Sequence, residues 1–167
     1  MSLRENDLLF RFDGSTNAVK FDDGAHNNDS IQPVDFLVEY EDRYRFVEVK
    51  DPDAQDARNV EAFRQKFRSG QLIRKLAGKY RDTVFSVSLQ DRPKKSIEYV
   101  VLLAMAELSP QVLIRQTDLL RKSIPVSHEK WRLDSAVACM ILNLGQYKSQ
   151  FGADSVLRVS EQTGRGL

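Results

Sequence analysis

The chain has little of what stabilises secreted or membrane proteins. It contains one cysteine, Cys139, which cannot form an internal disulfide and therefore favours a reducing compartment. No apolar run is long enough to cross a bilayer. Residues 1–7 are too polar to form a secretory signal. We therefore expect a cytoplasmic protein with no membrane association.

Several common catalytic signatures are also missing. The two histidines stand far apart in the sequence with no cysteine at ligand spacing, which argues against a zinc site. There is neither a P-loop nor the G-x-S-x-G of serine hydrolases. The net charge of +1 gives no general attraction to a polyanion. Only a local concentration of basic residues can therefore indicate nucleic-acid binding.

What is present is the composition of an ordinary globular domain. The 167 residues are 41% hydrophobic and 29% charged, so we expect residues 1–167 to form a single domain with a hydrophobic core. Short runs rich in Val, Phe and Tyr predict strands at residues 8–12, 18–21, 34–40 and 44–50. Turn formers at residues 13–17 are expected to join the first two strands, and residues 41–43 reverse the chain between the last two.

The rest of the chain alternates helical and strand patterns. Apolar residues at helical spacings predict one amphipathic helix over about residues 55–86, with Gly70 as a point where it kinks. Further expected elements are a buried strand at 97–105, a helix from Ser109-Pro110 to before Pro125, a strand at 135–142, a short helix capped by Asn143 and an edge strand at 156–159. The predicted fold is α/β, with a central mixed β-sheet containing a three-stranded meander and flanked by helices.

The predicted hairpin has a consequence for three charged side chains. If Tyr40 pairs with Arg43, then Asp35 lies opposite Glu48, because opposed residues of antiparallel strands point to the same face. Lys50, two residues after Glu48, shares that face. A slip of one residue in the pairing would separate these side chains, so the prediction depends on this register.

Two carboxylates and a lysine placed in this way suit phosphodiester hydrolysis. Neighbouring carboxylates repel each other unless a cation lies between them. Mg²⁺, or Mn²⁺ in its place, prefers oxygen ligands, and Asp35, Glu48 and the carbonyl of Val49 would suit it together with a substrate phosphate. Lys50 would then position or polarise the attacking water. The alternative is a simple cross-strand salt bridge among Asp35, Glu48 and Lys50 on a solvated face.

The same residues resemble a known signature. Pro33-Val34-Asp35, twelve further residues and Glu48-Val49-Lys50 are similar to the motif of the PD-(D/E)XK nuclease superfamily, which includes restriction enzymes, Holliday-junction resolvases and repair nucleases. The resemblance implies a restriction-endonuclease-like core over about residues 18–105, with residues 106–167 as an elaboration. It also implies that the aspartate and glutamate bind metal and that the lysine assists the water.

The acidic residues of the N-terminal segment depart from that superfamily. Many of its members carry a further acidic residue on a helix before the meander, whereas this chain has only Glu5 and Asp7 in a short stretch where strands are expected. Asp22 and Asp23, at the end of the strand predicted over residues 18–21, are the nearest substitutes. A solvated turn is the favoured explanation for this pair.

The helix expected over residues 55–86 contains a strongly basic segment. No acidic residue occurs between Phe63 and Asp82. The candidate phosphate contacts in this segment are Arg64, Lys66, Arg68, Arg74, Lys75 and Lys79. Such a segment can follow a phosphate backbone, although a solvated helix face explains the charges equally well.

The sequence therefore predicts a Mg²⁺-dependent nuclease whose partner is nucleic acid, with DNA as the first expectation, and it leaves a homodimer open. One alternative is a non-catalytic module on the same fold that binds nucleic acid or protein. Another is an interaction or structural domain with no role on nucleic acid. The presence of Asp35, Glu48 and Lys50 together favours the enzyme.

Overall fold

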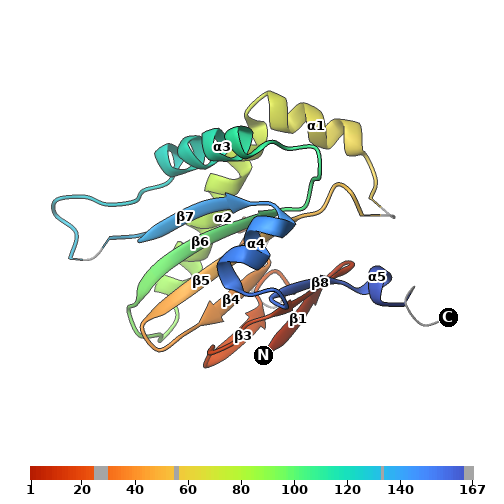
Figure 1. The fold of residues 1–167 in the computed structure, drawn as a ribbon. Coiled ribbons are helices and arrows are strands. Elements are labelled where there is room, and N and C mark those ends of the chain that lie inside the picture. The colour runs from red at the N-terminus through yellow and green to blue at the C-terminus, as the bar shows by residue number, and fades with distance from the viewer. Residues whose placement is uncertain (25–29, 55–56, 133, 164–167) are drawn as a thin grey trace.

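The centre of the fold is a five-stranded mixed sheet (Figure 1). The computed structural model describes residues 1–24, 30–54, 57–132 and 134–163. The order of the strands is β3-β4-β5-β6-β7. They comprise β3 (Asn17–Lys20), β4 (Phe36–Glu39), β5 (Arg43–Lys50), β6 (Ser96–Leu103) and β7 (Ala138–Leu142). The expectation of an α/β fold with a central mixed sheet is confirmed.

Strands β3, β4 and β5 form an antiparallel meander. In the β4–β5 hairpin Leu37 lies opposite Phe46, and the backbone N–H of Tyr40 donates to the Arg43 carbonyl at 2.8 Å. Continuing this register by two residues brings Asp35 opposite Glu48. The hairpin register expected from the sequence is confirmed.

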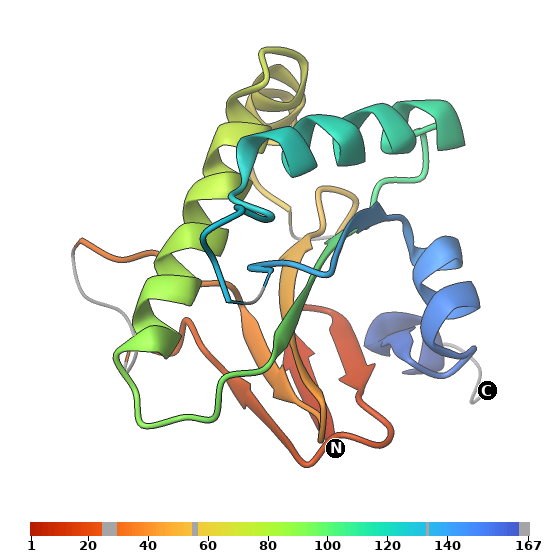
Figure 2. The ribbon, with the colours of Figure 1, turned by 90° about the vertical axis from the view of Figure 1, so that its left-hand side faces the viewer.

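Three helices cover one face of the central sheet (Figure 1, Figure 2). Helices α1 (Val60–Arg68) and α2 (Gln71–Ser88) connect β5 to β6, and α3 (Pro110–Ser123) connects β6 to β7. Each connection returns the chain to the same end of the sheet, so β5, β6 and β7 are parallel.

Aromatic packing holds α2 against the meander. The ring of Tyr80, on α2, lies with its centroid 6.0 Å from that of Phe46 and 5.1 Å from that of Tyr99. All three side chains are fully buried in one apolar cluster between the helices and the sheet. An α2 side chain that faces the sheet therefore has a fixed position relative to β4 and β5.

The single helix expected over residues 55–86 is two helices. Helix α1 ends at Arg68 and α2 begins at Gln71, and Gly70 between them has a φ of 73°. A left-handed residue cannot continue a right-handed helix, and glycine adopts this conformation without a steric penalty. One helix therefore ends before Gly70 and a second begins after it, so these residues do not form a single kinked helix. Residues 55 and 56, where the expected helix began, lie outside the described residues.

The opposite face of the central sheet carries a second antiparallel sheet that the sequence did not predict. Its order is β1-β2-β8, comprising β1 (Ser2–Glu5), β2 (Leu8–Arg11) and β8 (Val156–Arg158). The expected pair formed by residues 8–12 and 18–21 is wrong, since β2 pairs with β1 and β8. Phe10 supplies the reason. Its ring packs edge-on against Phe36 at 5.2 Å and Tyr147 at 5.7 Å, so β2 is held by a core between the two sheets.

The last third of the chain contributes to both layers. Helix α3 begins as expected, with the Ser109 hydroxyl accepting from the Val112 N–H and Pro110 in the first turn. Helix α4 (Leu144–Phe151) is preceded by its N-cap residue Asn143, which forms a reciprocal capping box with Gln146. A short helix, α5 (Val159–Thr163), follows β8. Within the described residues, no helix has the length and apolar character needed to cross a membrane.

Candidate active site

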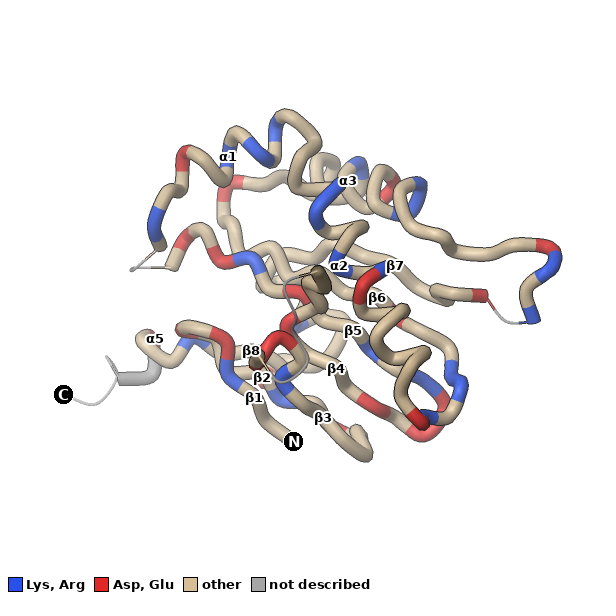
Figure 3. Tube along the Cα trace, turned by 180° about the vertical axis from the view of Figure 1, so that it is seen from behind, with Lys and Arg blue, Asp and Glu red and all other residues tan. Residues whose placement is uncertain are grey.

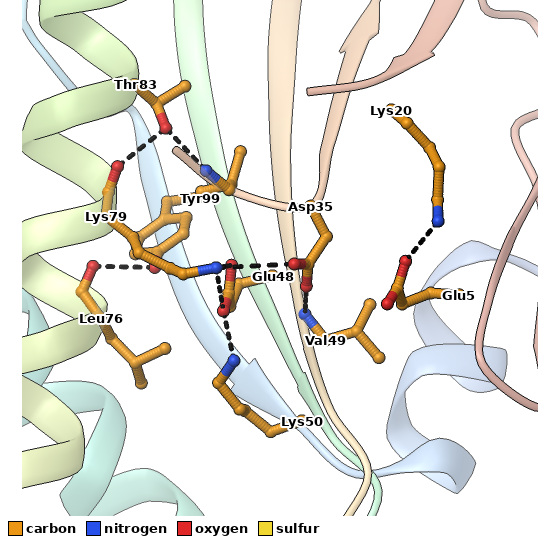
Figure 4. Close-up of polar contacts among 11 residues, drawn as sticks. Glu5, Lys20, Asp35, Glu48, Val49, Lys50, Leu76, Lys79, Thr83 and Tyr99 are labelled. Carbon is orange, nitrogen blue, oxygen red and sulfur yellow. Dashed lines mark hydrogen bonds and ion pairs between the residues drawn. The ribbon is translucent and has the colours of Figure 1, made fainter. Parts of the chain in front are cut away.

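Asp35 and Glu48 meet on the helical side of the central sheet (Figure 4). Asp35 immediately precedes β4, and Glu48 lies two residues beyond Phe46 on β5. The side chain of Asp35 is nearly buried and that of Glu48 is fully buried, with 0% of the residue exposed. Both carboxylates contact the same lysine ammonium group, so the two side chains converge as the hairpin register predicts.

Backbone contacts fix the orientation of Asp35. Its Oδ2 accepts a hydrogen bond of 2.5 Å from the N–H of Val49, and its own carbonyl accepts one of 2.8 Å from the N–H of Phe21. The side chain of Val49 belongs to the core on the other face of the sheet. Val49 therefore contributes only backbone groups to this site, and Asp35 is held by the two strands beside it.

Lys50 lies at the end of β5, at the boundary with solvent. Its Nζ is 2.5 Å from Glu48 Oε1, and its side chain is 30% exposed. A cavity of about 220 Å³ adjoins it, and its lining comprises Lys50, Asp51, Pro52, Ala57, Arg58, Val60 and Phe63. Lys50 thus connects a buried carboxylate with space in which a ligand can lie.

A second lysine, Lys79 of α2, lies between the two carboxylates. Its Nζ is 2.9 Å from Glu48 Oε2 and 3.5 Å from Asp35 Oδ1 (Figure 4). The side chain of Lys79 is 20% exposed. The site therefore contains two carboxylates and two ammonium groups, with Glu48 in contact with both lysines.

Contacts on either side of Lys79 set its position on α2. The Tyr99 hydroxyl donates to the Leu76 carbonyl at 2.9 Å. The Thr83 hydroxyl accepts from the Val34 N–H at 2.9 Å and donates to the Lys79 carbonyl at 2.7 Å. Leu76 and Thr83 lie three residues before and four residues after Lys79, so all three share one side of the helix. Sequence reasoning placed Lys79 among the phosphate contacts. Its spacing from Leu76 and Thr83 indicates the side of the helix on which it lies, but not the carboxylates that it meets.

The electrostatics of the site are those of crowded carboxylates. Burial, followed by the charge of Asp35, raises the pKa of Glu48 above its ordinary value. Burial, again followed by the neighbouring Asp35 carboxyl, raises the pKa of Asp22 to about 6. Burial lowers the pKa of Lys79, but the charges of Glu48 and Asp35 outweigh this effect and raise it overall. Lys79 therefore stays protonated, because the surrounding carboxylates stabilise its positive charge.

The other acidic residues singled out from the sequence lie in different places. Asp22 is hydrogen-bonded to Asp35 and so belongs to the carboxylate group, whereas Asp23 is exposed in the turn after β3. Glu5 on β1 forms an ion pair of 2.8 Å with Lys20 on β3 and adds to the charge that raises the pKa of Asp22. Asp7 accepts a hydrogen bond from the Ser160 N–H at the start of α5, away from the site.

The remaining basic candidates lie apart from the carboxylates, and basic residues occur on α1, α2 and α3 alike (Figure 3). Two of them pair with acidic residues near them: Arg64 with Glu107 at 3.1 Å and Arg68 with Glu61 at 3.7 Å. Arg74 and Lys75 are exposed on α2, and their side chains have no hydrogen bond or ion pair with any described residue. Lys66 is half-buried on α1. Arg74 and Lys75 are thus the basic pair most accessible to a ligand.

The donor set of the site is small but compatible with a hard cation. Within the described part of the chain, no three His, Cys, Asp or Glu side chains form a group that could hold a metal ion. Mg²⁺ needs fewer, because one or two carboxylates commonly bind it while water and substrate phosphate complete its shell. Burial, followed by the charge of Asp35, raises the pKa values of Glu48 and Asp22, and a cation bound beside Asp35 and Glu48 would reduce that repulsion. Asp35 and Glu48 therefore fit Mg²⁺ or Mn²⁺.

No known protein family, curated protein or solved structure matches this chain. The assignment of a function therefore depends on the residues of the site and on the strands that carry them.

Proposed function

We propose that the chain is a metal-dependent nuclease with a restriction-endonuclease-like fold. It would hydrolyse phosphodiester bonds in nucleic acid, with DNA as the first expected substrate. The observation that carries the proposal is the convergence of Asp35 and Glu48 from adjacent antiparallel strands, with Lys50 at the end of the second strand. A salt bridge on a solvated face does not require burial, yet Glu48 is completely buried. Burying a carboxylate is costly, and such groups with shifted pKa values concentrate at functional sites.

The proposal gives each residue a separate role. Asp35 and Glu48 would hold Mg²⁺ or Mn²⁺, with the carbonyl of Val49 as a further oxygen ligand. The bound ion would neutralise the substrate phosphate and lower the pKa of a water molecule. Lys50, beside both Glu48 and the adjoining cavity, would position the attacking water and stabilise negative charge that develops on the phosphate.

The basic residues of α1 and α2 would bind the substrate backbone. Arg74 and Lys75 are the strongest candidates because both are exposed. Lys66, Arg64 and Arg68 are weaker candidates, since the two arginines already pair with glutamates. A cytoplasmic location is part of the same proposal, because the thiol of Cys139 is free and buried.

A second candidate function has an observation of its own. Lys50 and Lys79 together give Glu48 two cationic partners, which a non-catalytic module could keep permanently. Such a module would bind nucleic acid or protein through its basic residues and would need no metal ion.

DNA cleavage separates the two candidates. Labelled duplex and single-stranded DNA are incubated with the wild-type protein in Mg²⁺, Mn²⁺ or EDTA, and Asp35→Asn serves as a variant of matched shape. We expect cleavage by the wild type with either metal, and none in EDTA or with Asp35→Asn. Binding of DNA without cleavage under every metal condition would leave the binding module as the function.

A further inference from the structure

The ammonium of Lys79 occupies the space between the two carboxylates that a shared cation would take. Its Nζ lies 2.9 Å from Glu48 and 3.5 Å from Asp35, whereas Lys50 contacts Glu48 from the solvent side. We infer that Lys79 is the resident counter-ion of the metal-free site and that a divalent cation binds by displacing it. This inference rests on the proposed function, because it concerns how the same site acquires its metal.

A divalent ion and the ammonium group cannot use the same space. Mg²⁺ lies about 2.0–2.1 Å from its oxygen ligands. An ion in contact with both Asp35 and Glu48 would therefore lie within a few ångströms of Lys79 Nζ in its present position. Like charges at such distances repel strongly in a partly buried site. Binding of the metal and the contacts of Lys79 therefore exclude each other.

The side chain of Lys79 can leave while its helix stays in place. One fifth of the side chain is exposed, and its four-carbon stem is flexible. Helix α2 is held independently, through the Thr83–Val34 hydrogen bond and the Tyr99–Leu76 hydrogen bond. Displacement then requires rotation of one side chain and no rearrangement of the backbone.

Displacement has two measurable consequences. Lys79 stabilises the metal-free protein, because removing one partner of a buried ion pair leaves the other charge uncompensated. It also weakens metal binding, because the ion has to replace existing contacts. Lys79→Met, which removes the charge and keeps the length, should therefore bind Mn²⁺ at least tenfold more tightly. Its Tm in EDTA should fall by roughly 5–10 °C.

Calorimetric titration with Mn²⁺ at pH 8, paired with thermal unfolding in EDTA, tests the inference. The wild type, Lys79→Met and the control Lys122→Met are compared, since Lys122 is exposed on α3 and has no role in the proposed site. If Lys79→Met does not fold, Lys79→Gln is titrated instead, because its amide can still donate to Glu48. Tighter binding and a lower metal-free Tm for the Lys79 variant alone are expected. A Lys79 variant with the Mn²⁺ affinity and metal-free Tm of the wild type would overturn the inference.

The same titrations separate this inference from the proposed function. If the wild type binds Mn²⁺ and cleaves DNA but the Lys79 variant has unchanged affinity, the nuclease stands and the displacement is wrong. If the wild type binds Mn²⁺ more weakly than Lys79→Met but cleaves no DNA under any metal condition, the displacement is right. The proposed nuclease activity of the wild type is then wrong.

Discussion

The hydroxyl of Thr83 accepts a hydrogen bond of 2.9 Å from the backbone N–H of Val34, which joins α2 to the segment that enters β4. Asp35 is the next residue along that segment, and Lys79 lies one turn before Thr83 on the helix. One buried contact thus fixes a site lysine relative to a site carboxylate. The geometry of the site depends on how α2 docks as much as on the hairpin.

Loss of this contact should destabilise the fold. Thr83→Val keeps the shape of the side chain but leaves the buried N–H of Val34 without its acceptor. The free energy of unfolding should fall by about 1–3 kcal/mol. Urea unfolding measures the change, and Ser88→Ala, at an exposed position of the same helix, should change it by less than about 0.5 kcal/mol. Equal stability of Thr83→Val and the wild type would show that the contact is dispensable.

Asp35 and Lys50 should differ in their effect on metal binding. We expect Mn²⁺ to raise the Tm of the wild type and Asp35→Asn to lose this rise, because the proposed carboxylate ligand is missing. Lys50→Ala should keep that rise but lose DNA cleavage, because in the proposed mechanism the ammonium would act on the water after the ion has bound. Thermal unfolding with and without Mn²⁺ tests both. A metal response lost equally in both variants would remove the distinction between ligand and water-positioning residue.

Asp22 should make stability fall as pH rises. Its folded-state pKa of about 6 exceeds the ordinary value of 3.8. Below about pH 3.8 the carboxyl is protonated in both states and contributes nothing. Between these values the folded state binds more protons, so the cost of Asp22 grows with pH and is complete above about pH 6. Asp22→Asn should therefore stabilise the metal-free protein at pH 7.5 and not at pH 4.

Denaturation in EDTA at the two pH values tests the effect of Asp22. Asp154→Asn is the control, because Asp154 is exposed near the end of α4, and its side chain has no partner among the described residues. An equal gain for Asp22→Asn at both pH values would contradict a raised pKa as its cause.

Arg74 and Lys75 should contribute to DNA affinity through phosphate contacts. Reversing both to Glu should weaken binding and reduce the slope of log K against log salt by about 2, since each phosphate contact contributes about 0.9. The control reverses Arg11 and Lys148, which lie on β2 and α4 on the other side of the central sheet. Fluorescence anisotropy at several salt concentrations gives both slopes. Equal slopes for the two double variants would assign Arg74 and Lys75 to solvation alone.

The sequence predicted the site hairpin because its information is local. Two adjacent strands and a three-residue reversal determine the parity that brings Asp35 opposite Glu48. Lys79 could not be placed in the same way, because its position depends on the docking of α2 through Tyr80 and Thr83. The second sheet was missed for a related reason. Phe10 is held by Phe36 and Tyr147, which are distant in sequence, and short strands reveal no pairing partner of their own.

The most direct test of the central claim is anomalous diffraction from crystals of the wild-type protein soaked in Mn²⁺. Asp35 and Glu48 are expected to hold an anomalous peak between them, at about 2.0–2.2 Å from a carboxylate oxygen of each. Lys79 is expected to have moved away from both carboxylates. Crystals soaked in millimolar Mn²⁺ with no peak at this position, and with Lys79 still between the carboxylates, would contradict a metal-dependent site.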